Sequence, residues 1–510
     1  MRSSQCARPN ALVHRQALAL QSPAVSSINS AMTQPNVAVL AAAGRGQRVH
    51  PRRRALPKVM LDVAGKSLLS RNIELVRDEL DIDDILIVVG HLGGQIRSAL
   101  GDGSTLGVRI RYVENDNVDG GLGTLFACIE PHITEPFYLL MGDELYLDTN
   151  HRDLLNIESD YTAVCALWEC EDPQLLRKNY LAEQVDGLIV SLTEKPVRSE
   201  TRQLGCGTFA FTPNIFKYAR STPFSAAGKL ELIDVIDHAA SRGEKVLPFN
   251  LTGDYVNVNT VEDLNLARFA VRNAQIDSTR ISIVIPCYNE AASIAQVIRD
   301  FSPHSDEVIV MDNNSVDGSA EIARSLGATV YSHALAGYGD ALKQGMDRAS
   351  GEILILVEAD GTFRSKDLGK FLEFLKDSDM AIGTRTTREM IEQGANMNGL
   401  LRWGNVLAGK FIEALWWGHE PRFTDVGCTY RAIWQESYQR IRPHLTRADA
   451  AFSPEMMIEM LRANGRVIEI PVSYYGRKGG ESKHSGSLAH SILTGLKMLG
   501  LILSKRFNLS

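Results

Sequence analysis

The chain has 510 residues, of which 44% are hydrophobic and 23% are charged, and its formal net charge is −7. This length exceeds what one hydrophobic core usually supports, so two or three domains are expected. The slightly acidic balance argues against a nucleic-acid binder. The seven cysteines include no Cys-x-x-Cys pair, which gives no zinc or disulfide framework and suits the reducing cytoplasm.

The two ends of the chain differ in composition from the rest. Residues 1–35 contain no acidic residue and carry three arginines, as some targeting peptides do. We favour a disordered tail or an over-extended start, because Met32 lies just before the first predicted strand. Residues 491–503 are apolar, but they are fewer than the ~20 residues of a membrane span. We interpret them as an amphipathic helix that packs on its own domain, with a position on a membrane surface as the alternative.

The same plan of elements occurs twice along the chain. Short apolar runs at residues 37–40 and 281–286 are each followed by a helical pattern and a second apolar run, at residues 85–89 and 307–311. Strand–helix–strand alternation predicts a parallel sheet covered by helices. We therefore predict an α/β protein with two doubly wound, Rossmann-like domains in tandem.

Each half also contains an apolar strand that ends on acidic residues. Residues 137–141 precede Asp143, and residues 353–357 precede Glu358 and Asp360. Ligands of open α/β sheets bind beyond the carboxyl ends of the strands. These carboxylates are therefore placed to hold a metal ion on a nucleotide.

The first predicted strand leads into a glycine loop at residues 44–48, which is followed by Pro57-Lys58 and Gly65-Lys66-Ser67. The glycine loop lacks the third glycine of a dinucleotide fingerprint, and the stretch that ends in Gly65-Lys66-Ser67 lacks the first glycine of a phosphate loop, so neither motif fits. The stretch does offer what a triphosphate needs. Gly44 and Gly46 allow backbone N–H groups to approach the phosphates, and Arg48 and Lys58 supply cations for the α-phosphate.

This order of motifs resembles the signature of sugar-phosphate nucleotidyltransferases, and it continues downstream. Gly121-Leu122-Gly123-Thr124 resembles the family's nucleobase loop, and Gly142-Asp143 resembles its metal-binding aspartate. Glu194-Lys195-Pro196 resembles the segment that holds the sugar phosphate, and Gly205-Cys206-Gly207 resembles the turn that follows. At the closing motif, where many members have an aspartate as second metal ligand, this chain offers Asn257 or Asn259.

The resemblance implies that residues 36–275 condense a nucleoside triphosphate with a sugar 1-phosphate, releasing pyrophosphate, with Mg²⁺ as cofactor. The metal ligands it implies are Asp143 with Asn257 or Asn259. The implied catalytic residues are Arg48, Lys58 and Asp143. The implied contacts to the nucleotide are Ala42, Gly44, Gly46, Gly123 and Thr124. The implied contacts to the sugar phosphate are Glu194, Lys195 and Gly207.

In the second half, Pro286-Cys287-Tyr288-Asn289-Glu290 follows a strand, and Asp312-Asn313-Asn314 follows the next one. Together they resemble the start of family 2 glycosyltransferases, which implies a GT-A-like domain over residues 279–510. Glu358-Ala359-Asp360 resembles that family's metal motif, with a glutamate where an aspartate is usual. The tail from Arg477 to Ser482-Lys483 resembles that of polyprenyl-phosphate sugar transferases of the dolichyl-phosphate mannosyltransferase type.

This second resemblance implies Mg²⁺ or Mn²⁺ on Glu358 and Asp360, and transfer of a sugar from a nucleotide sugar to an acceptor. Asp425 is either a general base or a residue that orders its loop, since a phosphate acceptor needs no base. The implied contacts to the nucleotide are Pro286, Tyr288, Glu290, Asp312 and Asn314. The implied contacts to the substrates are Arg431, Arg477, Ser482 and Lys483.

The combined expectation is a bifunctional cytoplasmic enzyme that makes a nucleotide sugar and then transfers the sugar. The acceptor implied by the resemblance is a lipid phosphate, reached by peripheral contact with the cytoplasmic face of the membrane, and a soluble acceptor stays open. Two alternatives stay open. The first half could activate a polyol or alcohol phosphate, or one half could be a non-catalytic scaffold.

Overall fold

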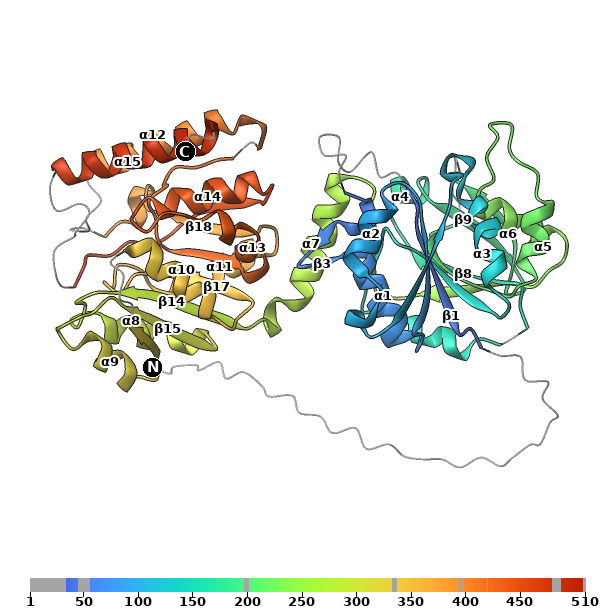
Figure 1. The fold of residues 1–510 in the computed structure, drawn as a ribbon, viewed down its shortest axis with the longest axis horizontal. Coiled ribbons are helices and arrows are strands. Elements are labelled where there is room, and N and C mark those ends of the chain that lie inside the picture. The colour runs from blue at the N-terminus through green and yellow to red at the C-terminus, as the bar shows by residue number, and fades with distance from the viewer. Residues whose placement is uncertain are drawn as a thin grey trace, which may run out of the picture.

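The computed structural model of the chain describes residues 34–44, 56–158, 160–196, 201–332, 337–392, 395, 399–419, 421–478 and 488–507. Most of the predicted tail, residues 1–33, lies outside them. Figure 1 shows two α/β bodies, built from the first half of the chain on the right and from the second half on the left. Each contains a large sheet, of nine strands in the first and seven in the second.

The sheet of the first half has a parallel centre made by the predicted strands. β1 (Val37–Ala42) pairs in parallel with β4 (Asp84–Val89) and β6 (Phe137–Met141), and β4 pairs in parallel with β5 (Arg109–Glu114). β11 (Gln203–Phe211) then runs antiparallel to β6. The sheet is completed by strands β8 (Ala163–Glu169), β9 (Tyr180–Val185), β10 (Leu188–Glu194) and β12 (Val246–Leu251).

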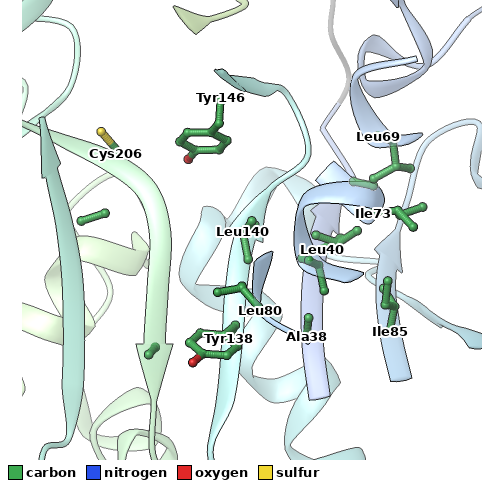
Figure 2. Close-up of a cluster of buried hydrophobic side chains, with 14 of the residues drawn as sticks. Ala38, Leu40, Leu69, Ile73, Leu80, Ile85, Tyr138, Leu140, Tyr146 and Cys206 are labelled. Atoms are coloured by element: carbon green, nitrogen blue, oxygen red, sulfur yellow. The ribbon is translucent and has the colours of Figure 1, made fainter. Parts of the chain in front are cut away.

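Helices cover both faces of this sheet. Two separate clusters of buried apolar side chains line its two faces, and Figure 2 shows part of one, where Leu40 and Leu140 of the sheet lie near Leu69 and Ile73 of a helix. That helix starts where the sequence allows it, because the Ser67 hydroxyl accepts a hydrogen bond from the backbone N–H of Ser70. The α-helices described in the first half are α1 (Leu68–Glu79), α2 (Gly93–Leu100), α3 (Leu125–Ile129), α4 (Pro173–Leu176), α5 (Ile215–Ser221), α6 (Leu232–Ser241) and α7 (Val261–Gln275).

Two short antiparallel ribbons lie outside the main sheet and carry residues of interest. β2 (Asp62–Val63) pairs with β3 (Lys66–Ser67), and β7 (Glu144–Leu147) pairs with β13 (Asp254–Asn257). The second ribbon begins directly after Asp143. It therefore joins the end of strand β6 to the closing motif of the first half.

The sheet of the second half also has a parallel centre. Its order is β16-β15-β14-β17-β19-β18-β20, parallel as far as β17 and antiparallel on both sides of β19. The strands are β14 (Ile281–Cys287), β15 (Glu307–Asp312), β16 (Thr329–Ser332), β17 (Ile353–Leu356), β18 (Met380–Thr384), β19 (Arg431–Trp434) and β20 (Val467–Pro471). The helices are α8 (Ile294–Phe301), α9 (Ser319–Ser325), α10 (Tyr338–Arg348), α11 (Leu368–Leu375), α12 (Gly399–Leu415), α13 (Gln435–Ile441), α14 (Phe452–Arg462) and α15 (Leu488–Phe507). The predicted fold, two doubly wound α/β domains in tandem, is confirmed.

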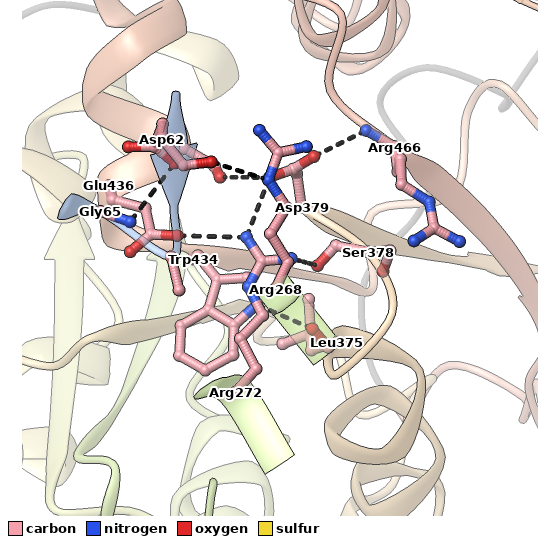
Figure 3. Close-up of polar contacts among 12 residues, drawn as sticks. Asp62, Gly65, Arg268, Arg272, Leu375, Ser378, Asp379, Trp434, Glu436 and Arg466 are labelled. Atoms are coloured by element: carbon pink, nitrogen blue, oxygen red, sulfur yellow. Dashed lines mark hydrogen bonds and ion pairs between the residues drawn. The ribbon is translucent and has the colours of Figure 1, made fainter. Parts of the chain in front are cut away.

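The two halves meet where α7 reaches the second sheet. Arg272, near the end of α7, is 2% exposed, and its guanidinium lies 2.9 Å from Asp379 and 3.1 Å from Glu436. Arg268, one turn earlier, donates to the backbone carbonyl of Asp62 in the β2–β3 ribbon. Figure 3 shows these groups as one cluster of polar contacts from four segments of the chain.

The last helix, α15, extends beyond the predicted residues 491–503 at both ends. It packs on its own domain, as expected, because Leu501 and Ile502 are buried and Lys505 lies 2.8 Å from Glu455 and 2.9 Å from Glu459 of α14. Among the helices that the structure describes, none combines the length and the apolar character of a membrane span.

Candidate active sites

The first site lies beyond the carboxyl ends of β1 and β6. Lys58, on a short 3-10 helix over Lys58–Met60, is 9% exposed and places its ammonium group 2.5 Å from Asp143 Oδ2. The same ammonium group donates to Asn259 Oδ1 at 2.9 Å. These three residues, 85 and 201 positions apart, thus converge on one point.

Local structure fixes the two oxygen-bearing residues. Asp143 lies between β6 and β7, and its carbonyl accepts from the backbone N–H of Val258 at 3.1 Å. Asn259 precedes the capping box of α7, in which Thr260 and Asp263 exchange hydrogen bonds. Its amide donates to Asn257 Oδ1 at 2.6 Å, so both predicted asparagines belong to one chain of hydrogen bonds.

The oxygens that meet on Lys58 suit a magnesium ion. Asp143 Oδ2 and Asn259 Oδ1 already share one cation, and carboxylate and amide oxygens are the hard ligands that Mg²⁺ takes. Within the described ranges, no three His, Cys, Asp or Glu side chains cluster as a metal site. In proteins, Mg²⁺ is commonly held by one or two protein oxygens together with substrate phosphates.

A buried carboxylate next to Asp143 was not predicted from the sequence. Glu144 is 4% exposed and accepts hydrogen bonds from the Tyr146 hydroxyl, the Tyr255 hydroxyl and the backbone N–H of Gly207, at 2.5, 2.7 and 2.8 Å. Burial, reinforced by the charge of Asp143, raises the pKa of Glu144 to about 7. The residue joins β7, β13 and β11, so it holds the segment behind Asp143. Its position directly after a predicted ligand was the only signal for it in the sequence.

The loops predicted to contact the nucleotide lie at the same end of the sheet. Ala42 is the last residue of β1, and the backbone N–H of Gly123 donates to the carbonyl of Leu230. A side chain at Gly123 would collide with that carbonyl, and Thr124 is bound through its hydroxyl to the carbonyl of Gly121. Gly44 has open space around it, whereas Gly46 and Arg48 lie outside the described residues.

The predicted sugar-phosphate segment follows β10. Lys195 is paired with Glu194 and adopts a left-handed backbone conformation, with φ of 47°. Gly207 lies in β11, where a side chain would collide with Met141 and with the carboxylate of Glu144. The glycine there is therefore required by the packing of β6 and β7 against β11.

The second site lies beyond the carboxyl ends of β14, β15 and β17. Arg477 bridges two acidic residues, with its guanidinium 2.8 Å from Asp360 and 3.4 Å from Glu290. The other oxygen of Asp360 accepts from the backbone N–H and the hydroxyl of Thr362, which fixes its orientation. Burial, together with the neighbouring charge of Asp360, raises the pKa of Glu358. Two adjacent carboxyl groups of this kind, facing a cation, fit a divalent ion on a diphosphate.

Four residues of the predicted nucleotide site lie at or just after the carboxyl ends of β14 and β15. Pro286 is within β14, and Tyr288, which is exposed, follows it. Asp312 ends β15, is 4% exposed and accepts from the backbone N–H of Ser315. Asn314 in that turn has a left-handed conformation, with φ of 57°, which asparagine tolerates better than most residues.

Asp425 occupies a position that favours the ordering role. It is fully buried, and both its oxygens are engaged by the Arg385 guanidinium, at 2.8 and 2.9 Å. The backbone N–H groups of Arg385 and Gly427 donate to it as well. Arg385, which follows β18, was missed in the sequence, although a cation at the end of a strand was a signal for it.

Arg431 lies away from any surface, in contrast to the expected substrate contact. It is 1% exposed within β19, and its guanidinium donates to the carbonyls of Cys428, Val426 and Ser453. Its position in the strand turns it into the domain, where backbone carbonyls satisfy it. Ser482 and Lys483 lie outside the described residues.

Comparison with known proteins separates the chain into the same two halves. The family model described as nucleotidyl transferase matches residues 37–272, and the one described as glycosyl transferase family 2 matches residues 282–434. A low-salt glycan biosynthesis nucleotidyltransferase, Agl11 of Haloferax volcanii, is 30% identical over 44% of this chain and 63% of its own length.

Two relatives match the second half. The glycosyltransferase AglJ of Haloferax volcanii is 31% identical over 39% of this chain and 64% of its own length. An uncharacterized glycosyltransferase of Mycobacterium bovis is 30% identical over 42% of this chain and 93% of its own length. The chain thus spans less than two thirds of either Haloferax protein and nearly all of the mycobacterial one. With these matches and the two folds, the chain belongs to the nucleotidyltransferase family in its first half and to glycosyltransferase family 2 in its second.

Proposed function

We propose that the N-terminal domain, residues 36–275, joins a nucleoside triphosphate to a sugar 1-phosphate, and that the C-terminal domain, residues 279–510, transfers a sugar from a nucleotide sugar to a polyprenyl phosphate. One observation carries this proposal. In each domain a cation from a distant segment meets acidic residues at the carboxyl ends of the parallel strands, Lys58 on Asp143 and Arg477 on Asp360. Lys58 and Asp360 are buried, and each meets its partner at the place where open α/β sheets bind their ligands.

In the N-terminal domain, a phosphate oxygen of the sugar 1-phosphate attacks the α-phosphorus, and the bond to pyrophosphate breaks. The nucleophile is already an anion, so catalysis consists of positioning and charge stabilisation, without a side-chain base. Among the residues that the structure describes, Lys58 is the cation that we expect to contact the reacting phosphate. Asp143 and Asn259 are the residues that would hold magnesium. The metal would neutralise charge on the triphosphate.

In the C-terminal domain, Asp312 and Glu290 lie where the nucleoside of the donor is expected, and Asp360 and Glu358 lie where its diphosphate is expected. A divalent ion there would hold the charge of the nucleoside diphosphate that leaves. A phosphate oxygen of the acceptor attacks the anomeric carbon without a base, which agrees with the engagement of Asp425 by Arg385. Arg477 lies between Asp360 and Glu290 at this site, and we expect its guanidinium to contact a substrate phosphate.

The relatives support the pairing of the two activities. Two separate Haloferax volcanii proteins, one a glycan biosynthesis nucleotidyltransferase and one a glycosyltransferase, each resemble one half of this chain. We infer that the fused halves act in succession, at the cytoplasmic face of a membrane. Activation of a polyol phosphate is the second candidate, because the triphosphate side of the site would be the same.

The test is pyrophosphate release by the full chain with magnesium, each of the four nucleoside triphosphates, and a panel of sugar 1-phosphates and polyol phosphates. We expect release with one sugar 1-phosphate, abolished in Asp143→Ala and retained in Asp360→Ala. The nucleotide sugar so identified is then supplied with a short-chain polyprenyl phosphate in detergent, where transfer should be lost in Asp360→Ala and retained in Asp143→Ala. Release with polyol phosphates alone would overturn the sugar-activating proposal.

A further inference from the structure

Exposed apolar side chains gather on two adjacent helices of the C-terminal domain. On α12 and the 3-10 turn after it, Trp403, Leu407 and Trp417 are 62%, 68% and 78% exposed. On α15, the large exposed side chains are Leu496, Leu499, Leu503 and Phe507. Among the described residues that follow position 280, most exposed large apolar side chains lie on these elements.

The spacing of these residues gives α15 a continuous apolar stripe on its outer side, and on α12 the exposed Trp403 and Leu407 lie one turn apart. The exposed residues of α15 follow one another at intervals of three, four and four positions, which places them on one face of an α-helix. The inner side of the same helix is already occupied, because Leu501 and Ile502 are buried and Lys505 is held by α14. The outer stripe is therefore additional to what the domain needs for packing.

The two helices lie side by side at the outer edge of the domain. Contacts join α15 to both α12 and α14, and Figure 1 shows α15 and α12 running along the upper edge of the left-hand body. Exposed apolar side chains gathered on adjacent helices are the kind of surface that marks an interaction site.

The charges on these helices have one predominant sign. α15 contains no acidic residue, and its Lys497 and Arg506 are exposed. The single acidic residue of α12, Glu413, is paired with Lys410. An apolar helix face flanked by cations is the pattern of a helix that lies in the interface of an anionic membrane.

Segments that precede the two helices in the chain meet beside the second active site. The segment that leads into α12 carries Ile391 and Glu392, and the segment that leads towards α15 carries Tyr474 and Gly476. Ile391 forms a β-bridge with Tyr474, and the Glu392 carboxylate accepts from the backbone N–H of Gly476 at 2.8 Å. Arg477, the next residue, contacts Asp360.

We propose that α12 and α15 form a docking surface that lies on an anionic lipid bilayer, with their exposed apolar side chains in the headgroup region. The surface rests on the proposed function in one respect, since it would bring the Asp360–Arg477 site to the plane in which a lipid phosphate lies. It requires no membrane span, because one face of each helix is buried in the domain and the other faces the lipid.

The test measures docking without catalysis. The full-length protein is sedimented with sucrose-loaded vesicles of phosphatidylcholine, with or without phosphatidylglycerol, and without nucleotide sugar or polyprenyl phosphate. We expect binding to the anionic vesicles, and a decrease on the order of tenfold or more in Leu407→Glu/Leu496→Glu, because each change removes apolar area and adds a charge of the wrong sign. Phe224→Glu, at a residue that is 56% exposed in the N-terminal domain, is the matched control and should bind as the wild type does.

Each remaining outcome is decisive. Failure of the wild type to bind, or equal binding of the double variant, would overturn the docking surface. A dimer by light scattering that the double variant converts to a monomer, without vesicle binding, would assign the patch to a second copy of the chain and overturn the membrane proposal. Transfer to a short-chain acceptor in detergent should be unchanged in the double variant, so loss of docking and loss of function are distinguishable.

Discussion

The ammonium group of Lys58 lies 2.5 Å from Asp143 Oδ2 and 2.9 Å from Asn259 Oδ1, on the two oxygens that are the best candidates for holding magnesium. A cation of the protein thus occupies the place that a metal ion would take. Since one oxygen pair cannot fully satisfy both cations, metal binding and movement of Lys58 towards the substrate phosphates are expected to occur together.

Replacement of this lysine should have opposite effects on metal binding and on catalysis. Lys58→Met removes the competing cation, so the affinity for Mn²⁺ without nucleotide should rise on the order of tenfold, which requires only ~1.4 kcal/mol. The rate of nucleotide transfer should fall by about 10²–10³, as for loss of one stabilising group at a transition state. Electron paramagnetic resonance of bound Mn²⁺ and pyrophosphate release measure the two effects.

The control for Lys58 is Lys66→Met. The Lys66 side chain is 52% exposed and pairs with Glu74 rather than with Asp143 and Asn259, so neither quantity should change. Weaker Mn²⁺ binding in Lys58→Met would contradict the idea that the lysine competes with the metal.

The second cation, Arg477, gives a parallel prediction for the other domain. Arg477→Met should lower the rate of sugar transfer by about 10²–10³, because the guanidinium is expected to bind phosphate at the site. Arg477→Lys should restore only part of it, since a lysine cannot span Asp360 and Glu290 with a planar fork. Pyrophosphate release by the N-terminal domain of the same protein is the internal reference.

An exposed cation of the C-terminal domain serves as the control for Arg477. Arg324→Met alters a side chain that is 49% exposed and pairs within its own helix, so transfer should be unaffected. If Arg477→Met also retained full transfer activity, a role for Arg477 at the phosphates would be excluded.

The sequence predicted those features that depend on local pattern. The apolar runs became the parallel strands β1, β4, β14 and β15, and the acidic residues that follow two further strands, β6 and β17, lie beyond the carboxyl ends of the strands in each sheet. Lys58 and Asn259 are 201 positions apart in the sequence, and no local pattern shows that they are in contact. Their contact depends on the path of the chain through both ends of the domain.

Residues whose role depends on where the side chain points in the folded domain were harder to predict. Arg431 belongs to a motif of the site, but motif membership does not tell which side of β19 it occupies, and it lies inside the domain. Arg272 has the sequence pattern of an ordinary cation in the last turn of a helix. Only the docking of α7 against the second sheet makes it a buried partner of Asp379.

The contact between the halves should contribute a pH-dependent stability. Burial alone would raise the pKa of Asp379, but the guanidinium groups of Arg272, Arg440 and Arg268 outweigh burial and hold that pKa well below its usual range. A lowered pKa in the folded state means that the stabilisation is present above the unfolded value of about 3.9, and is lost as the pH falls towards the folded value.

Asp379→Asn should therefore lower the free energy of unfolding at pH 7 by about 3–5 kcal/mol, because it removes the nearer of the two carboxylates that pair with the buried Arg272. The difference from the wild type should shrink below pH ~4, where the unfolded chain binds the proton. Urea unfolding between pH 3 and 7 measures both. Glu373→Gln, at a side chain that is 67% exposed, should show neither effect. A difference that stayed constant over this pH range would contradict the assignment to the charge of Asp379.

The two roles left open for Asp425 can be separated by a double substitution. The carboxylate is fully buried against Arg385, so Asp425→Asn should lower stability by about 3–5 kcal/mol, since one charge of a buried pair stays behind. Asp425→Asn/Arg385→Met removes both charges and should recover most of that stability. If Asp425 only orders the loop, the pH profile of sugar transfer should keep its shape in the single variant, with a moderate loss of rate. If Asp425 is a general base, the single variant should instead lose about 10²–10⁴ in the rate of sugar transfer, and one limb of its pH profile should disappear. The double variant would then recover stability without recovering activity.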